Sequence, residues 1–227
     1  MRREQQHEVR QVGLQPTDEL LEARMLAAVA GQAGSSMHLH VSLVDGNGGN
    51  VFSAADGSEH PCFQQFIGGL QAYLPDLMLL LAPHVNSYRR FVRGSQAPIH
   101  LGWGHDNRSA GLRVPLSGPA ARRIEQRVSG SDANPYLAIA ATLAAGLAGL
   151  DEGLAATEPL EANGYGQAHT LPRTAREAWQ GLAESASARR LLDDDFVTGF
   201  VAAKEVELDD HDREISAWER RYLLPQV

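Results

Sequence analysis

The stretch Met37-His38-Leu39-His40-Val41-Ser42-Leu43 alternates strictly between apolar and polar side chains. Successive side chains of a β-strand point to opposite faces, so this alternation predicts a strand with one buried face. The other face would carry His38, His40 and Ser42. Residues 45–50 (Asp-Gly-Asn-Gly-Gly-Asn) are typical of a tight turn, and they predict a hairpin whose second strand starts directly after them.

The rest of the chain predicts further strands, followed by helices. Apolar alternation predicts strands over residues 99–104, 110–114 and 122–128. Helical spacing predicts helices over residues 17–30, 62–81 with a break at Pro75, 135–150, 174–185 and 196–222 with an interruption near 209–212. A run of strands followed by a run of helices indicates the α+β class rather than repeated βαβ units. We therefore predict an antiparallel, curved sheet with helices packed on one face.

The composition excludes several classes of protein. Of the 227 residues, 43% are apolar and 21% are charged, which indicates a globular domain rather than a disordered chain. The net charge of −8 disfavours general binding to nucleic acid or to an anionic membrane. A single cysteine, Cys62, excludes an internal disulfide and a thiolate metal cage. The chain has no apolar run of membrane-spanning length and its start does not resemble a signal peptide, so we expect a cytoplasmic protein.

The polar face of the first predicted strand is a candidate site. Two imidazoles and a hydroxyl, from His38, His40 and Ser42, could bind a metal ion or a phosphate group there. Two histidines do not close a metal site by themselves. A solvent-facing pair without a function is therefore the alternative interpretation.

A second candidate is the stretch Arg123-Ile124-Glu125-Gln126-Arg127, where the same alternation places the three charged side chains on one face. A carboxylate beside arginines stays ionised, so Glu125 could bind a hard divalent cation. Arg127 could take a carboxylate or a phosphate through two parallel hydrogen bonds. The alternative is a surface ladder of ion pairs.

Residues 86–113 are unusually rich in arginine for an acidic protein. Asp106 is their only acidic residue, and uncompensated positive charge indicates an anionic ligand. Nucleic acid is the competing anion, because aromatic residues are interleaved with the basic ones. The nearby Glu125 and the two histidines favour a small phosphate with a metal ion instead. The arginines are Arg89, Arg90, Arg93, Arg108 and Arg113.

Taken together, these segments resemble the C-terminal half of the glutamine synthetase catalytic domain. The resemblance extends from about residue 31 to the C-terminus, so we expect a divergent N-terminal segment over 1–30 and a partial catalytic domain over 31–227. The sequence around Trp103 is more similar to that of the γ-glutamyl-amine ligase branch of the family than to that of the housekeeping enzyme. The matching segments are 34–43 (Gly-Ser-Ser-Met-His-Leu-His-Val-Ser-Leu), 86–90 (Asn-Ser-Tyr-Arg-Arg), 97–98 (Ala-Pro), 106–109 (Asp-Asn-Arg-Ser), 112–115 (Leu-Arg-Val-Pro), 123–127 and 132–137 (Asp-Ala-Asn-Pro-Tyr-Leu).

The resemblance implies an ATP-dependent amide ligase. The γ-carboxylate of glutamate would be phosphorylated, and ammonia or an amine would then displace the phosphate to give an amide. The cofactors would be ATP and Mg²⁺ or Mn²⁺, and members of the family are homo-oligomers. The implied roles are metal ligation by His38 and Glu125, glutamate binding by Gly34, Arg90 and Arg127, ATP binding by His40, Ser42, Arg108 and Arg113, and catalysis by Arg90 and Arg108.

Two departures from the family bear on activity. The family has a flap glutamate that accepts a proton from ammonium, and this chain has Gln96 there, whose amide cannot act as a base. The family also has acidic strands and an N-terminal β-grasp domain before the histidine strand, where this chain has a short segment. His38 and Glu125 alone are too few ligands for a stable Mg²⁺ site.

Three hypotheses follow from these observations. The chain is an amide ligase of the glutamine synthetase type, or a truncated non-catalytic remnant that associates with a full-length paralogue, or a module that binds nucleotide or small anions without turnover. We expect no nucleic-acid or membrane partner. The sequence leaves open the acceptor amine, the oligomeric state, the effect of Gln96, whether the chain is active alone, and whether the truncation is biological or arises from the reading frame.

Overall fold

The computed structural model describes residues 34–93, 95 and 97–226, and it contains one four-stranded sheet. The predicted helix over 17–30 and the flap residue Gln96 lie outside these residues. The strands are β1 (Leu39–Val41), β2 (Trp103–His105), β3 (Leu112–Val114) and β4 (Ile124–Gln126), in the spatial order β1-β4-β3-β2. All four were predicted, although the structure shortens each of them. The α+β class is confirmed.

The sheet is mixed rather than wholly antiparallel, which corrects the predicted topology. β4 is antiparallel to both β1 and β3, but β2 and β3 run parallel. The reason is the loop over 106–111, which turns back after β2 at Asp106, whose φ of 46° is left-handed. This loop brings the chain back past the start of β2 before β3 begins. The predicted hairpin at 45–50 is present, but its return strand is reduced to the isolated antiparallel bridge Val44↔Asn50 and a hydrogen bond from the N–H of Val51 to the carbonyl of Leu43.

Seven helices are present in the described residues, and they lie where the sequence placed them with one addition. Pro75 does separate the two parts of the predicted helix over 62–81. The short α5 was not predicted, and the last break falls at 214–216 instead of 209–212. The helices are α1 (Pro61–Tyr73), α2 (Met78–Leu81), α3 (Pro135–Glu152), α4 (Ala175–Glu184), α5 (Ala186–Leu192), α6 (Asp194–Arg213) and α7 (Ala217–Tyr222).

Local capping explains where the longer helices begin. The side chain of Asn134 accepts a hydrogen bond from the backbone N–H of Tyr136, and Pro135 then starts α3. Thr174 caps α4 in the same way. Asp193 accepts hydrogen bonds from two backbone N–H groups at the start of α6, where a negative charge also favours the helix.

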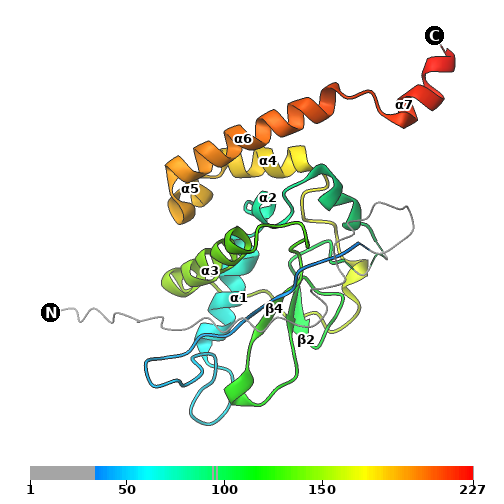
Figure 1. Cartoon of the computed structure of the whole chain (residues 1–227). Helices are drawn as coiled ribbons and strands as arrows, with labels where there is room; N and C mark the ends of the chain where they lie inside the picture. Colours follow the sequence, from blue (N-terminus) through cyan, green and yellow to red (C-terminus); the bar gives the residue numbers. More distant parts are fainter. Residues whose placement is uncertain (1–33, 94, 96, 227) are drawn as a thin grey trace.

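The helices cover the sheet in two layers (Figure 1). α1 and α3 pack closely together beside the sheet, and α4 to α6 lie beyond them over α2. One apolar core cluster joins the sheet to helices α1 to α6, and its largest fully buried side chains include Phe52, Phe63 and Phe66. Core packing on one side leaves the opposite face of the sheet free to carry polar side chains.

The closest approach of two helices in the core is between α1 and α3. A Cβ atom built on Gly69 would lie 2.3 Å from the carbonyl oxygen of Ala145, and one on Gly149 would lie 2.3 Å from that of Gln65. Such distances are far below van der Waals contact, so glycine is required at both positions. The two backbones therefore touch directly.

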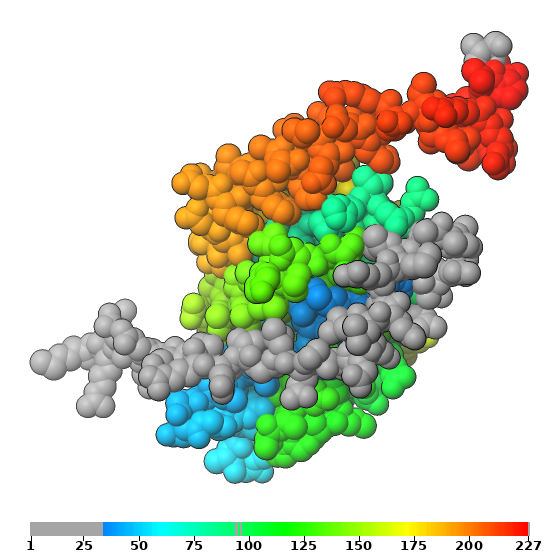
Figure 2. All heavy atoms as spheres, viewed as in Figure 1, coloured from blue at the N-terminus to red at the C-terminus, as the bar shows by residue number. Residues whose placement is uncertain are grey.

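The C-terminal helix α7 projects from the rest of the molecule. Figures 1 and 2 show it at the far end of α6, away from the sheet. Its aromatic residues Trp218 and Tyr222 are 60% and 51% exposed and contact each other, with ring centres 5.4 Å apart. Among the helices that the structure describes, none has the length and apolarity needed to cross a lipid bilayer.

Candidate active site

Three polar side chains from three strands form one row across the sheet. His40 on β1 pairs with Glu125 on β4, and Glu125 pairs with Arg113 on β3. Directly paired residues of antiparallel strands project to the same face, so the three side chains lie side by side. The predicted alternation in β1 and β4 is therefore confirmed, with Leu39 and Val41 buried on the core side.

Glu125 is the centre of this row. Its side chain is 3% exposed, and its two carboxylate oxygens accept three contacts from positive or potentially positive groups. Nδ1 of His38 lies 2.8 Å and Nη1 of Arg127 lies 3.1 Å from Oε1, while Nη1 of Arg113 lies 2.7 Å from Oε2. The group is thus a buried ion cluster rather than the surface ladder that was the alternative.

The surroundings of Glu125 fix its protonation state. Burial by itself raises the pKa of a carboxyl group, because it disfavours the charged form. Here the hydrogen bonds from His38 and Arg113 and the charge of Arg127 outweigh burial, and they lower the pKa of Glu125 to about 2. Glu125 is therefore an ionised carboxylate at every physiological pH.

His40 on β1 and His38, which directly precedes this strand, face the carboxylate differently. His38 contacts Glu125 through Nδ1, and its Nε2 lies 3.0 Å from the hydroxyl oxygen of Ser36. His40 accepts a hydrogen bond at Nδ1 from Nε of Arg123 over 3.3 Å. Burial, with the neighbouring positive charge of Arg123, lowers the pKa of His40 although Glu125 opposes the shift. His40 is therefore a neutral ring that can donate or accept a hydrogen bond. Ser42 follows it on the same strand face, half-buried.

The arginines predicted to bind phosphate occupy different environments. Arg113 is held between two carboxylates, because its Nε also donates to Oδ1 of Asp106 over 3.0 Å. Arg108 is exposed on the loop after β2, and it forms no ion pair with any residue of the described ranges. Arg113 is fixed in place, whereas Arg108 has room to move toward a ligand.

A small cavity of about 110 Å³ joins the residues predicted to bind glutamate. It brings together segments that are far apart in the sequence, namely the chain before β1, the segment after the 3₁₀ helix over Val85–Arg90, and the end of β4. Its lining residues are Gly34, Ser36, His38, Arg90, Ser95, Ala97, Pro98 and Arg127. We call it the Arg90–Arg127 pocket.

The two guanidinium groups of this pocket have unused donors. Arg90 is 3% exposed and donates to the backbone oxygen of Val128, but its Nε and Nη1 have no partner among the described residues. The Nε of Arg127 is likewise buried without a described partner. Burial lowers the pKa of Arg90 to about 10, so the group still carries its charge at neutral pH. Buried donors without acceptors indicate an anionic ligand.

His38 and Glu125 fit as part of a metal site but do not complete one. The nitrogen and oxygen atoms that would be the ligands lie 2.8 Å apart, close to the roughly 3 Å that separates neighbouring ligands around an octahedral cation. Within the ranges that the structure covers, however, no group of three or more histidine, cysteine or acidic side chains is arranged to hold a metal ion. Further ligands for Mg²⁺ would have to come from outside this set of residues.

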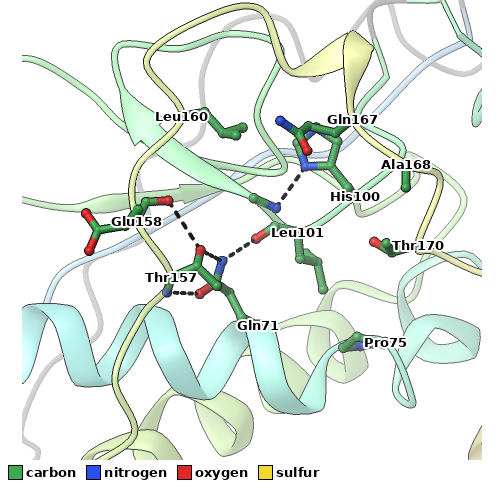
Figure 3. Close-up of a pocket in the computed structure, with 11 residues that line it drawn as sticks. Gln71, Pro75, His100, Leu101, Thr157, Glu158, Leu160, Gln167, Ala168 and Thr170 are labelled. Atoms are coloured by element: carbon green, nitrogen blue, oxygen red, sulfur yellow. Dashed lines mark hydrogen bonds between the residues drawn. The ribbon is translucent and has the colours of Figure 1, made fainter.

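A wider hollow lies away from these residues, between α1 and the segment over 157–170 (Figure 3). It has a volume of about 520 Å³, and its walls include Leu101, Leu160 and Pro75. His100 lines it, but both of its ring nitrogens are engaged, Nε2 with the carbonyl of Gly164 and Nδ1 with the N–H of Gly102. None of the predicted site residues is part of this hollow.

Fold and site together define an α+β domain whose sheet presents a buried carboxylate, two histidines and an arginine pocket. A family model described as the glutamine synthetase catalytic domain matches residues 18–223. The chain therefore belongs to the glutamine synthetase family, within its catalytic domain.

Several curated proteins and a solved structure are similar to this chain. γ-Glutamylputrescine synthetase PuuA of Escherichia coli is 41% identical over 194 residues, which cover 85% of this chain and 41% of that protein. γ-Glutamylethanolamide synthetase GlnA4 of Streptomyces coelicolor is 41% identical over 190 residues, covering 83% and 40%. A solved structure of GmaS without ligand matches with a TM-score of 0.78 and 30% identity, covering 88% of this chain and 47% of that one. The chain spans less than half the length of these relatives.

The sequence pattern missed two partners of the site. Asp106, which holds Arg113, is part of a matching segment but was assigned no role. Ser36, which contacts His38, lies in the same segment as Gly34 and was also overlooked. The contact of Asp106 depends on how a loop turns, for which strand alternation carries no signal. Ser36 lies two residues before His38 in an extended segment, so the alternation could have placed both on one face.

Proposed function

We propose that this chain forms the glutamate- and phosphate-binding half of an ATP-dependent ligase that joins the γ-carboxylate of glutamate to ammonia or an amine. The observation that carries the proposal is the Arg90–Arg127 pocket, which opens beside His38 and the ionised Glu125. Membership of the glutamine synthetase family and the similarity to two γ-glutamyl-amide synthetases support it.

Each group of the site has a task in that reaction. Arg127 and Arg90, with their unused donors, would hold the carboxylates of glutamate. Glu125 fixes Arg127 from behind, so the guanidinium is oriented before the substrate arrives. Arg113 and the exposed Arg108 would neutralise charge on the phosphates, and His40 and Ser42 would contact the nucleotide. His38 and Glu125 would supply two ligands of a divalent cation, which provides further charge neutralisation when it is bound.

Glutamate binding tests the pocket directly. The purified chain is expected to bind L-glutamate weakly in isothermal titration calorimetry, and Arg127→Gln should reduce the affinity at least tenfold, because a charge-assisted hydrogen bond contributes about 1.5–3 kcal/mol. Arg220→Gln, an exposed residue on α7, is the matched control and should bind glutamate as the parent chain does. Equal affinity of the parent chain and Arg127→Gln would remove the basis of the proposal.

An assay of turnover tests whether the chain has too few metal ligands to be active alone. We expect no measurable γ-glutamyl hydroxamate from the 227-residue chain supplied with ATP, Mg²⁺ or Mn²⁺, glutamate and hydroxylamine. The reason is that the described residues offer two metal ligands, whereas Mg²⁺ takes six. A robust rate from the isolated chain would show that this count is wrong.

The small number of metal ligands also favours a second candidate function. A chain that keeps the arginine pocket but holds its cation weakly would bind nucleotide or small anions without turnover. Weak ATP binding together with no hydroxamate would fit this function for the chain on its own. Turnover that appears only when a longer homologue is added would instead indicate association with that protein.

A further inference from the structure

A second basic pocket lies outside the site described above. It has a volume of about 350 Å³ and opens between the 3₁₀ helix over Val85–Arg90 and the segment that leads into α4. This is within the range of small-molecule sites, which measure about 300–1,000 Å³. Its lining residues are Tyr88, Phe91, Val92, Arg93, His169 and Arg173. We call it the Arg93–Arg173 pocket.

The polar atoms of this pocket lack partners. Tyr88 is 4% exposed, and its hydroxyl is buried with no hydrogen-bond partner among the described residues. Burial raises the pKa of Tyr88 far above its ordinary value, so the hydroxyl keeps its proton and needs an acceptor. Nε2 of His169 is also buried without a described partner. Leaving two such atoms unpaired costs free energy, which indicates that a ligand completes them.

The charge of the pocket is positive. Neither Arg93 nor Arg173 forms an ion pair with a carboxylate of the described ranges, and Arg93 has only one long contact, of 3.4 Å, to the carbonyl of Gln167. Glu177, on the first turn of α4, is the nearby acid, and its side chain accepts a hydrogen bond from the backbone N–H of Arg173. Two guanidinium groups without a carboxylate partner in the described ranges attract an anion.

The remaining walls are apolar. Phe91 is buried, and its ring contacts that of Tyr88 edge-on, with centres 5.9 Å apart. Val92 is 52% exposed although it is a branched apolar residue. An apolar wall beside the two arginines favours a ligand with an apolar body over a bare inorganic ion.

We propose that the Arg93–Arg173 pocket binds a small organic anion. The two guanidinium groups and the hydroxyl of Tyr88 hold its carboxylate or phosphate group, and an aromatic or apolar body lies against Phe91 and Val92. The pocket shares no lining residue with the Arg90–Arg127 pocket, so the two ligands would contact different residues. The proposal therefore stands whether or not the chain is part of a ligase.

Calorimetry with four probes tests the ligand class. In titrations of the whole chain, 3-phenylpropionate and phenyl phosphate are expected to saturate one site. Inorganic phosphate, which has the charge without the body, should bind at least tenfold more weakly. 3-Phenylpropanol, which has the body without the charge, should give no detectable binding. The stronger of the two aromatic anions identifies the acidic group that the pocket prefers.

Variants locate the site. Arg93→Gln and Arg173→Gln should each weaken binding of the aromatic anion at least tenfold, while the control Arg220→Gln leaves it unchanged. All three residues are exposed, so folding should be unaffected, and unfolding curves will verify this. Tyr88→Phe removes one unpartnered hydroxyl, and it should weaken binding without lowering stability.

Three outcomes would overturn the proposal. The first is no binding of the aromatic anion by the parent chain. The second is binding that neither Arg93→Gln nor Arg173→Gln changes. The third is displacement of the probe by L-glutamate in proportion to glutamate occupancy, which would place the probe in the Arg90–Arg127 pocket. If Arg127→Gln loses glutamate binding but still binds the probe, the Arg93–Arg173 pocket is supported. This outcome distinguishes the present proposal from the proposed function.

Discussion

Replacing Glu125 with alanine is expected to lower the free energy of unfolding by about 3–5 kcal/mol. The carboxylate accepts contacts from Arg113, Arg127 and His38, and its side chain is 3% exposed. Removing it leaves two guanidinium groups close together in a poorly hydrated part of the sheet without their common counter-charge. Urea unfolding followed by circular dichroism measures the loss. A variant less than 1 kcal/mol below the parent would contradict the central position we assign to Glu125.

Glu205→Ala is the matched control for this experiment. Glu205 lies on α6, is exposed, and has no side-chain hydrogen bond or ion pair with a described residue. Its replacement by alanine, which suits a helix, should change the free energy of unfolding by less than about 0.5 kcal/mol. The difference between the two variants isolates the contribution of the buried cluster.

The stability of the chain in acid should also depend on the ion cluster around Glu125. The pKa of Glu125 is about 2 in the folded chain against an ordinary 4.5, so between these values the unfolded chain binds the extra proton. The stabilisation is therefore complete above about pH 4.5 and is lost as the pH falls toward 2. Glu125→Gln cannot take up this proton, and its free energy of unfolding should depend less steeply on pH in that window. Identical slopes for Glu125→Gln and the parent chain would show that the pKa of Glu125 is not lowered on folding.

Gly69→Ala is the second substitution with a large expected effect, about 3 kcal/mol or more of lost stability. The added Cβ would lie 2.3 Å from the carbonyl oxygen of Ala145 and 2.7 Å from Cα of Gly149. Both atoms are backbone, so no side chain can rotate out of the way, and α1 and α3 must move apart. Thermal and urea unfolding measure the effect.

Gly181→Ala provides the matched comparison, because this residue also lies inside a helix, α4, but a Cβ there meets no atom within 4 Å. Alanine restricts the unfolded chain and favours the helix, so this variant should gain about 0.5–1 kcal/mol. The same chemical change thus has opposite signs at two positions. Equal effects at both would mean that α1 and α3 do not touch as described.

The strands and their polar faces were predictable from the sequence because alternation is a local property. The side chains of His38 and Glu125 had to point to one face of their strands whatever the rest of the chain did. The alternation did not predict that these two strands lie adjacent with His40 opposite Glu125, and this register is a finding of the structure. Helix positions were equally predictable, since caps and apolar spacing are local signals.

Contacts made by loops could not be predicted in this way. The loop that joins the parallel strands β2 and β3 begins at Asp106, whose backbone is left-handed, and an aspartate in a turn does not by itself predict that conformation. The Arg93–Arg173 pocket unites residues about eighty positions apart, through two segments without regular alternation. Contacts between irregular segments that are far apart in the sequence leave no local sequence pattern.

The contacts of Glu125 also bear on the order in which the protein becomes functional. Its negative charge is already balanced by neighbours on the same chain, so the sheet can assemble during synthesis before any divalent ion or nucleotide has arrived. A cation that binds at His38 and Glu125, as proposed above, would have to compete with an imidazole and two arginines, so its binding would be reversible. We therefore expect a chelator to leave the chain folded, because no contact of Glu125 within the described residues requires a metal ion.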